Sequence, residues 1–109
     1  MATQACAIWG DDLVHYDFGL GHPMAPLRIA LTARLCRDLG VFDHVEVVEP
    51  GEADDELLAT VHDRDYIASV RSVSEQPHLA DGSNGCGTED VPAFAGMHEA
   101  SARLVAGTV

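Results

Sequence analysis

Residues 26–50 read PLRIALTARLCRDLGVFDHVEVVEP, and this stretch decides the fold. Leucine recurs at every fourth residue over 27–39, which is the spacing of one apolar face of a helix. Pro26 suits the first turn of that helix, and Gly40 suits its end. The β-branched run over 45–48 then predicts a strand. The stretch therefore predicts a helix that leads into a strand.

The residues before this stretch predict another strand and a loop. The apolar run from Ala5 to Trp9 stops at a glycine and two aspartates, and it predicts a buried strand. Residues 19–26 contain two glycines and two prolines, a composition typical of a defined loop. The predicted helix thus connects two predicted strands.

Residues after this stretch predict three helices and a loop. Asp54 or Asp55 can cap a first helix, and Asp63 or Asp65 can cap a second. The glycine- and serine-rich residues 77–87 predict a loop. A last helical pattern covers about 92–106. The side chains that we expect to face inward are Leu57, Leu58, Val61, Tyr66, Ile67, Val70, Val73, Phe94, Met97, Ala100, Leu104 and Val105.

The order of these elements predicts an α/β fold with a parallel sheet. Two strands are too few for such a sheet, which normally carries helices on both faces. At 109 residues the chain is one domain at most. We therefore expect the first part of a larger domain.

The charge balance excludes some classes of protein. The chain carries 18 acidic residues and six basic ones, all arginine, for a net charge of −12. Nucleic acid binding needs clustered cations, so we expect none. The chain has no apolar run of membrane-spanning length, and its start lacks the basic segment of a secretory signal. We expect a cytoplasmic protein. The acidity favours solubility, and an acidic rim that attracts a cationic substrate is the alternative.

Three cysteines, Cys6, Cys36 and Cys86, lie far apart in the sequence. An odd number without a close pair argues against a disulfide framework and against a cysteine zinc site. We expect buried free thiols, except for Cys86, which the glycine-rich loop would expose.

Four stretches in order resemble the N-terminal part of the zinc-dependent deacetylases of the histone deacetylase and acetoin utilization (AcuC-type) family. They are YDFGLGHPMAPLR at 16–28, LLATVHDRDYI at 57–67, GTEDVPAF at 87–94 and GMHEAS at 96–101. The resemblance implies an arginase–deacetylase fold, a parallel sheet flanked by helices that is incomplete here. It implies that residues 1–109 are an N-terminal fragment that ends before the zinc site.

The resemblance also implies roles for three residues. Asp90 matches the aspartate at the rim of the family's active site, which accepts backbone N–H groups of a peptide substrate. Its alternative is to cap the helix after Pro92. Arg28 matches an arginine of an internal channel, and its alternative is a solvated charge on a helix. Tyr16 lies near the expected channel wall, or it is a core aromatic residue.

Histidines outside this set have simpler interpretations. His22, between a glycine and a proline, is more often a loop-fixing hydrogen-bonder than a metal ligand. His62 and His98 lie within helical patterns, where a chemical role is uncommon. A small metal site built from Asp17, His22 and neighbouring acids has no ligand spacing to support it.

The sequence lacks the family's metal ligands. None of its six histidines follows an aspartate by two residues, and it has no His-His pair. The resemblance implies zinc in the full-length family, and acetylated proteins or small acetylated amines as substrates of the complete enzyme. For this chain alone we expect no bound cofactor, no catalytic residue and no deacetylase activity. The alternative is a non-catalytic binding or regulatory module derived from the same fold.

Overall fold

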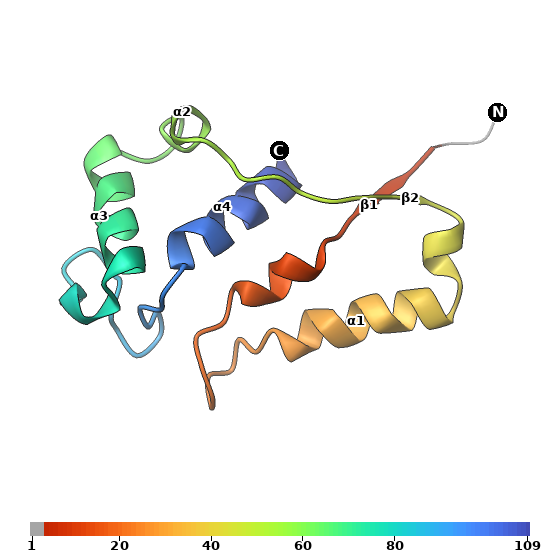
Figure 1. Ribbon diagram of the computed structural model, residues 1–109, viewed down its shortest axis with the longest axis horizontal. Helices are drawn as coiled ribbons and strands as arrows, with labels where there is room; N and C mark the ends of the chain where they lie inside the picture. Colours follow the sequence, from red (N-terminus) through yellow and green to blue (C-terminus); the bar gives the residue numbers. More distant parts are fainter. Residues whose placement is uncertain (1–3) are drawn as a thin grey trace.

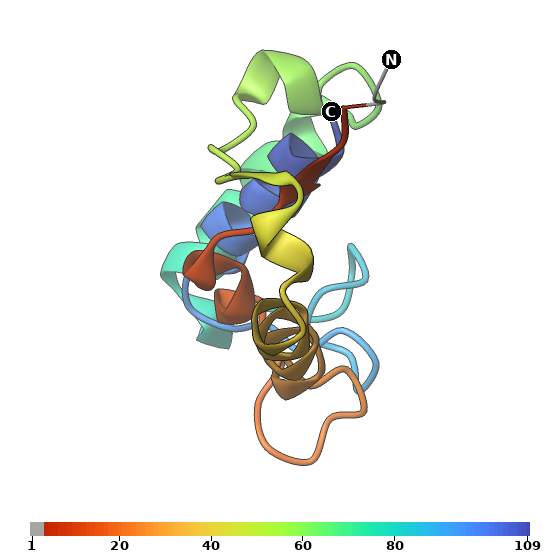
Figure 2. The same cartoon turned by 90° about the vertical axis from the view of Figure 1, so that its right-hand side faces the viewer.

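A computed structural model describes residues 4–109. The N-terminal segment, in which we expect no secretory signal, begins at residue 1, so its first three residues lie outside this range. The described chain is flat and elongated, with extents of 51 × 33 × 17 Å (Figures 1 and 2). Its elements are β1 (Cys6–Ile8), the 3-10 helix η1 (Asp11–His15), α1 (Leu27–Asp38), η2 (Val41–Asp43), β2 (Glu46–Val48), α2 (Asp55–Leu58), α3 (Arg64–Glu75), η3 (Pro77–Leu79) and α4 (Met97–Thr108).

The two strands form a parallel sheet, as the element order predicts. Cys6 pairs with Glu46 and Ile8 with Val48, and the Trp9 N–H donates to the Val48 carbonyl at 3.0 Å. The expectation of a buried first strand is wrong, because Ile8 is 39% exposed. A sheet of two strands has two free edges, and in the described chain both strands stay largely open to solvent.

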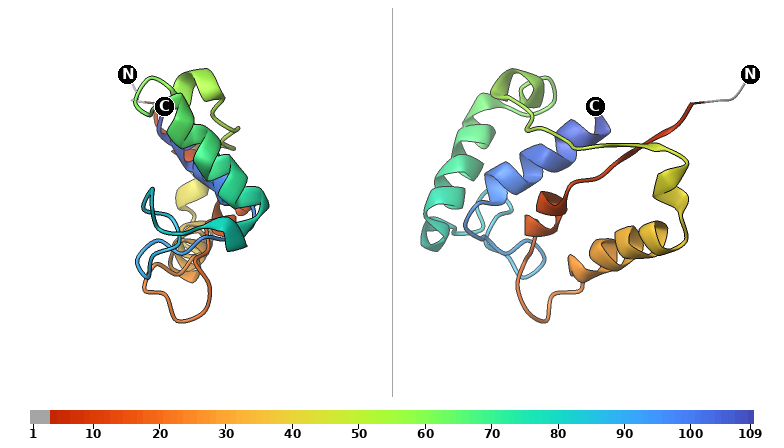
Figure 3. Two further views of the ribbon diagram at one scale, coloured as in Figure 1. Left: turned by 90° about the vertical axis from the view of Figure 1, so that its left-hand side faces the viewer. Right: turned by 45° about the vertical axis from the view of Figure 1, so that its right-hand side comes forward.

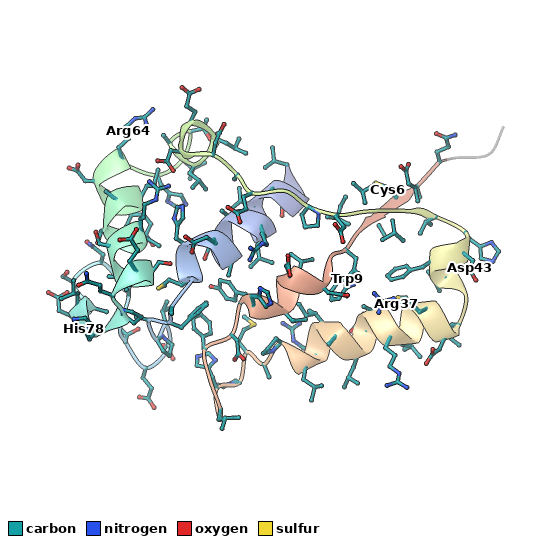
Figure 4. The ribbon with its side chains drawn as sticks, viewed as in Figure 1. Cys6, Trp9, Arg37, Asp43, Arg64 and His78 are labelled. Atoms are coloured by element: carbon teal, nitrogen blue, oxygen red, sulfur yellow. The ribbon has the colours of Figure 1, made fainter. Side chains whose placement is uncertain are left out.

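Helix α1 has the predicted bounds. It begins directly after Pro26, and Gly40 follows its end with a φ of +76°, a conformation that favours glycine. Its inner side contains the buried Ala33. Asp11 of η1 accepts hydrogen bonds from Trp9 Nε1 at 3.2 Å and from Arg37 Nη2 at 3.4 Å, which ties the last turn of α1 to the end of β1 (Figure 4).

The leucine face of α1 is exposed. Leu27, Leu31, Leu35 and Leu39 have exposed fractions of 62%, 55%, 58% and 70%. These leucines lie opposite Ala33, because a spacing of four residues keeps side chains on one side of a helix. The apolar face that the sequence predicts therefore exists, and no described residue covers it.

Helices α3 and α4 lie side by side, at the end of the elongated molecule away from α1 (Figures 1 and 3). Their buried residues include Ile67, Val73, Met97 and Ala100, all four on the predicted inward list. Helix α4 begins at Met97 rather than near Pro92. The reason is Gly96, whose φ of +81° directs the chain into the helix only at that point.

Five further expectations about burial are wrong. Tyr66 is 37% exposed, with its ring 5.3 Å from that of the exposed His62. Val61 is 82% exposed, because α2 ends at Leu58 and leaves it on a surface turn. Leu104 is 38% exposed, on the outer side of α4. Cys6 is exposed on the open strand β1. Cys86 is buried, because its loop closes through a 2.8 Å bond from the Gly82 N–H to the Cys86 carbonyl, and the side chain contacts Val73 and Met97.

Other details of the α2 segment follow the prediction. The Asp54 carboxylate accepts the Leu57 N–H at 2.9 Å and caps α2.

None of the helices among residues 4–109 is long and apolar enough to cross a lipid bilayer.

Candidate functional site

Two glycine-containing loops approach each other, and the first of them leads into α1. The first covers residues 16–26. Gly19 and Gly21 have φ values of +100° and +82°, and the Asp17 carboxylate accepts the Gly19 N–H at 2.9 Å. The His22 N–H donates to the Gly19 carbonyl at 3.4 Å. These turns bring the side chain of His22 back toward the second loop.

The second loop covers residues 85–92 and carries Asp90. The Gly87 N–H donates to the Val91 carbonyl at 2.8 Å, and the Val91 N–H donates to Thr88 Oγ1 at 3.1 Å. Gly87 has a φ of +90°, and a Cβ there would stand 2.8 Å from the Ala80 Cβ. Both the backbone conformation and the space therefore require glycine at the base of this loop.

His22 connects the two loops. Its Nε2 lies 3.0 Å from the Asp90 carbonyl oxygen, across 68 positions of sequence. Its Nδ1 accepts the Met24 N–H at 3.0 Å. The interpretation of His22 as a loop-fixing residue is therefore confirmed. Between the loops lies a cleft of about 620 Å³, lined by Phe18, Leu20, Gly21, His22, Pro23, Gly87, Thr88, Glu89, Asp90 and Pro92.

A cluster of aromatic side chains packs beside both loops. Tyr16 meets Phe18 edge-on at 5.1 Å between ring centroids and Phe94 at 5.8 Å. Phe18 also contacts the His22 ring at 4.6 Å. Burial raises the pKa of the Tyr16 phenol above its usual value, and the nearby Cys86 raises it further. Tyr16 is thus a partly buried, neutral aromatic residue.

Asp90 is exposed, lines the cleft and does not cap a helix. Gly96 is the residue at the start of α4, and no side chain caps that helix. The helix-cap alternative for Asp90 is therefore wrong, and its rim role stays a prediction.

Arg28 lies on the first turn of α1, exposed, with its Nη2 3.3 Å from the Met24 sulfur. Met24 is also the residue whose backbone binds His22. Asp90 is thus part of the second loop, and Arg28 contacts the first loop through Met24. The channel role of Arg28 stays a prediction, as does that of Tyr16.

A polar network connects α2, α3 and α4, and the sequence does not indicate it. Arg71 donates to both carboxylate oxygens of Asp55, at 2.8 and 2.6 Å, and its Nη2 lies 3.0 Å from Nε2 of the buried His98. A guanidinium only donates, so His98 Nε2 accepts. The paired Arg71 holds the pKa of the Asp55 carboxyl below its usual value.

This network continues through the start of α4. The His98 N–H donates to Ser74 Oγ at 3.1 Å, and Ser74 Oγ donates to Glu99 Oε2 at 3.1 Å. The pKa of the Glu99 carboxyl lies below its usual value, chiefly because the carboxylate accepts the backbone N–H of Glu99. The hydrogen bond from Ser74 lowers this pKa further. The partners come from separate helices, so no local spacing in the sequence could have indicated them.

The sequence profile of the histone deacetylase domain matches residues 22–109, well over half of the chain. The chain belongs to the histone deacetylase family. It is 42% identical over 96 residues to the acetoin utilization protein AcuC of Bacillus subtilis (strain 168), a match that covers 86% of this chain and 25% of AcuC.

More distant relatives within the family come from eukaryotes. Histone deacetylase 19 of Arabidopsis thaliana is 29% identical over 109 residues, which cover 97% of this chain and 22% of that protein. Histone deacetylase 1 of Homo sapiens is 31% identical over 100 residues, covering 88% and 20% respectively. The chain therefore spans a quarter or less of the length of these relatives, and its α/β structure with a parallel sheet corresponds to part of a deacetylase domain.

The deacetylase family implies a metal cofactor in its full-length members, and the described residues do not fit one. Among residues 4–109, no three histidine, cysteine, aspartate or glutamate side chains lie close enough together to hold a metal ion. The small site considered around Asp17 and His22 does not form. Asp17 caps the Gly19 N–H, and both ring nitrogens of His22 already have partners.

Proposed function

We propose that this chain supplies the N-terminal part of a zinc-dependent deacetylase that acts on acetyl-lysine or related acetylated amines, and that it is inactive alone. The observation that carries the proposal is the match of residues 22–109 to the histone deacetylase domain. The two loops that carry the family motifs meet at one cleft, which supports the proposal that the chain takes part in substrate binding.

Asp90 is the residue that we propose for substrate binding. Its carboxylate is exposed at the cleft and can accept two backbone N–H groups of an extended peptide. Hydrogen bonds to an ionised acceptor are stronger than neutral ones. Glu89 adds a second carboxylate to the lining, which contains no arginine, so the cleft favours neutral or cationic segments beside the acetylated lysine.

The exposed leucine face of α1 supports a role within a larger domain. Full burial of one leucine side chain stabilises a protein by about 1.5–3 kcal/mol, so the four exposed leucines leave several kcal/mol unrealised. Arg28 precedes Leu35 by seven residues, which places the two about 20° apart around the helix axis and so on the same side. The proposed channel therefore lies on the side of α1 that further residues of a deacetylase domain would cover.

Zinc dependence is part of the proposal, but residues 4–109 do not gather a set of ligands for the ion. In such enzymes zinc polarises an amide carbonyl and activates a water molecule. We assign no residue of this chain to that chemistry. The share proposed for this chain is to hold and orient the peptide at the rim and to shape the cleft.

The direct test restores the rest of a deacetylase domain. Residues 1–109 are fused to the part of Bacillus subtilis AcuC beyond the matched region, and acetate release from an acetyl-lysine peptide is measured with and without a chelator. We expect chelator-sensitive activity from the fusion and none from the chain alone. Activity of the isolated chain, or a folded and zinc-loaded fusion without activity, would contradict the proposal.

The same fusion tests Asp90. Replacing it in Asp90→Asn removes the charge and leaves the size unchanged, and we expect KM for the peptide to rise about 10-fold or more with a smaller change in kcat. The matched control is Glu89→Gln, the neighbouring carboxylate, for which we expect less than about a 3-fold change. Equal effects of the two substitutions would mean that Asp90 contributes only its charge to the cleft and makes no specific hydrogen bond to the peptide.

A non-catalytic binding module is the second candidate, favoured by the separate core of α3 and α4. It predicts that the isolated chain binds an acetyl-lysine peptide and unfolds in one sharp, reversible transition. The deacetylase proposal predicts weak cooperativity, because sheet edges and the leucine face stay uncovered. Thermal unfolding followed by circular dichroism, together with a peptide titration, separates the two.

A further inference from the structure

The two hydrogen bonds of the His22 ring determine its protonation. The Met24 backbone N–H can only donate, so Nδ1, 3.0 Å away, carries no proton. The Asp90 carbonyl can only accept, so Nε2, also 3.0 Å away, carries one. The neutral tautomer with the proton on Nε2 satisfies both contacts at once.

The loop that carries Asp90 has hydrogen bonds among its own residues and one hydrogen bond to a residue of the first loop. The Gly87–Val91 bond and the two bonds of Thr88 connect residues of the segment 85–91 to one another. At Asp90 itself the bond from His22 is the connection to the first loop. Within the described chain, it is the sole hydrogen bond between residues 16–26 and 85–92.

The ring of His22 is itself held in place. Phe18 contacts it with a centroid separation of 4.6 Å and an interplanar angle of 45°. Phe18 in turn meets Phe94 edge-on at 5.7 Å, and Phe94 lies two residues beyond Pro92 at the end of the second loop. An imidazole fixed by an aromatic face and by Met24 directs its Nε2–H at one point, the Asp90 carbonyl.

We propose that His22 is the positioning residue for Asp90: its Nε2–H fixes the backbone of residue 90, and with it the direction of the carboxylate at the cleft. Substrate binding by that carboxylate rests on the proposed function, whereas the link between the loops does not. His22 does not touch the reacting atoms in this assignment. It acts through the backbone of the residue that would bind the peptide.

Two substitutions separate the two nitrogens. His22→Gln places an amide N–H₂ near the position of Nε2, so it keeps a donor for the Asp90 carbonyl and loses the acceptor for Met24. His22→Asn places an amide oxygen near the position of Nδ1, so it keeps the acceptor for Met24 and cannot reach Asp90. The control is His78→Gln, an exposed histidine on η3 at the opposite end of α3 from Arg64 (Figure 4).

The test uses the 109-residue chain and the exchange of the amide hydrogens of Gly87 and Val91, which are hydrogen-bonded within the loop, followed by NMR. We expect His22→Asn to accelerate their exchange about 2- to 12-fold, the range that one net hydrogen bond supplies. We expect His22→Gln to restore exchange to within about 2-fold of the parent, and His78→Gln to leave it unchanged. Equal acceleration by Gln and Asn, or none by either, would overturn the proposal.

A measurement without substitution keeps the proposal falsifiable if a variant does not fold. Nitrogen-15 NMR of the parent chain reports which ring nitrogen carries the proton. We expect a bare Nδ1 and a protonated Nε2 at His22, and the opposite neutral tautomer would contradict the proposal. Neither measurement needs catalysis, so failure of the proposed deacetylase activity would leave this result unaffected, and a failed link would leave the deacetylase assignment standing.

Discussion

The two ends of this chain bury their apolar side chains to different extents. At one end, α3 and α4 enclose Val73, Cys86 and Met97, with exposed fractions of 8%, 7% and 5%. At the other end, β1, α1 and β2 leave Ile8 and the leucines of α1 at 39–70% exposure. Both ends have apolar residues at helical spacing in the sequence, and this spacing alone does not say which of them are buried.

The difference shows where the stability of the isolated chain comes from. Helices α3 and α4 cover each other and are joined by the network of Asp55, Arg71 and His98. Strands β1 and β2 pair only with each other among the described residues, and α1 packs mainly on η1 and η2. We infer that the α3–α4 end is the more stable, and four predictions test this comparison.

The largest effect is expected in the core of the stable end. Met97→Ala removes a side chain that is 5% exposed, and we expect the free energy of unfolding to fall by about 2–5 kcal/mol. Amide exchange along α4 and urea unfolding measure the change. The matched control is Leu31→Ala on α1, which is 55% exposed and should change stability by less than about 1 kcal/mol. Comparable losses would show that both ends are equally well covered.

Next comes the base of the loop that carries Asp90. We expect Gly87→Ala to destabilise the chain by about 1–3 kcal/mol, because it adds a clash with Ala80 to an unfavourable φ. Gly85→Ala is the control, since it has the same kind of φ, +84°, with open space around its Cβ. The reactivity of the buried thiol of Cys86 with a thiol reagent reports the opening of this segment. A larger effect at Gly85 would mean that the clash is not the cause.

A smaller effect is expected from the ion pair between α2 and α3. Arg71 lowers the pKa of Asp55, so their interaction stabilises the fold above the ordinary pKa of an aspartate, about 3.9, and is lost as pH falls through the lowered value. We expect Arg71→Met to lower the melting temperature at pH 7 and to weaken its fall between about pH 5 and 2. Arg34→Met is the control, since Arg34 meets Asp38 at 3.8 Å on an exposed surface. Identical pH profiles for the two variants would contradict this assignment.

The smallest effect is expected at the uncovered end. Leu35→Glu puts a charge on a face that is 58% exposed, and we expect a change within about 0.5 kcal/mol in the isolated chain. In the fusion with AcuC the same change should be strongly destabilising, because it would bury an unpaired charge. Thermal unfolding of both proteins provides the measurement. A large loss in the isolated chain would show that something already covers this face.

Local features of the fold followed from the sequence. The bounds of α1, the cap at Asp54 and the parallel pairing of the two strands depend on neighbouring residues or on element order. The sequence predicts the start of α4 near Pro92, whereas the helix begins at Met97. The actual start depends on the positive φ of Gly96, which the glycine alone did not reveal.

The candidate site was predictable in its residues and not in its contacts. Resemblance to the deacetylase family named Asp90, Arg28 and Tyr16, and the structure brings the loops of all three together. It did not indicate that His22 would bond to the backbone of Asp90, because nothing in a linear pattern relates positions 68 apart. The same reason hid the contact between Arg71 and His98.

The sequence by itself determined the membership of the family, the α/β class and which segments become helices and strands, since motifs, periodicity and capping are properties of adjacent residues. Tertiary structure alone decided which of the predicted apolar faces is covered, that Cys86 is buried, and which partners the ring of His22 binds. Burial and hydrogen bonding between distant segments depend on what else occupies the same space, and a linear sequence does not state this.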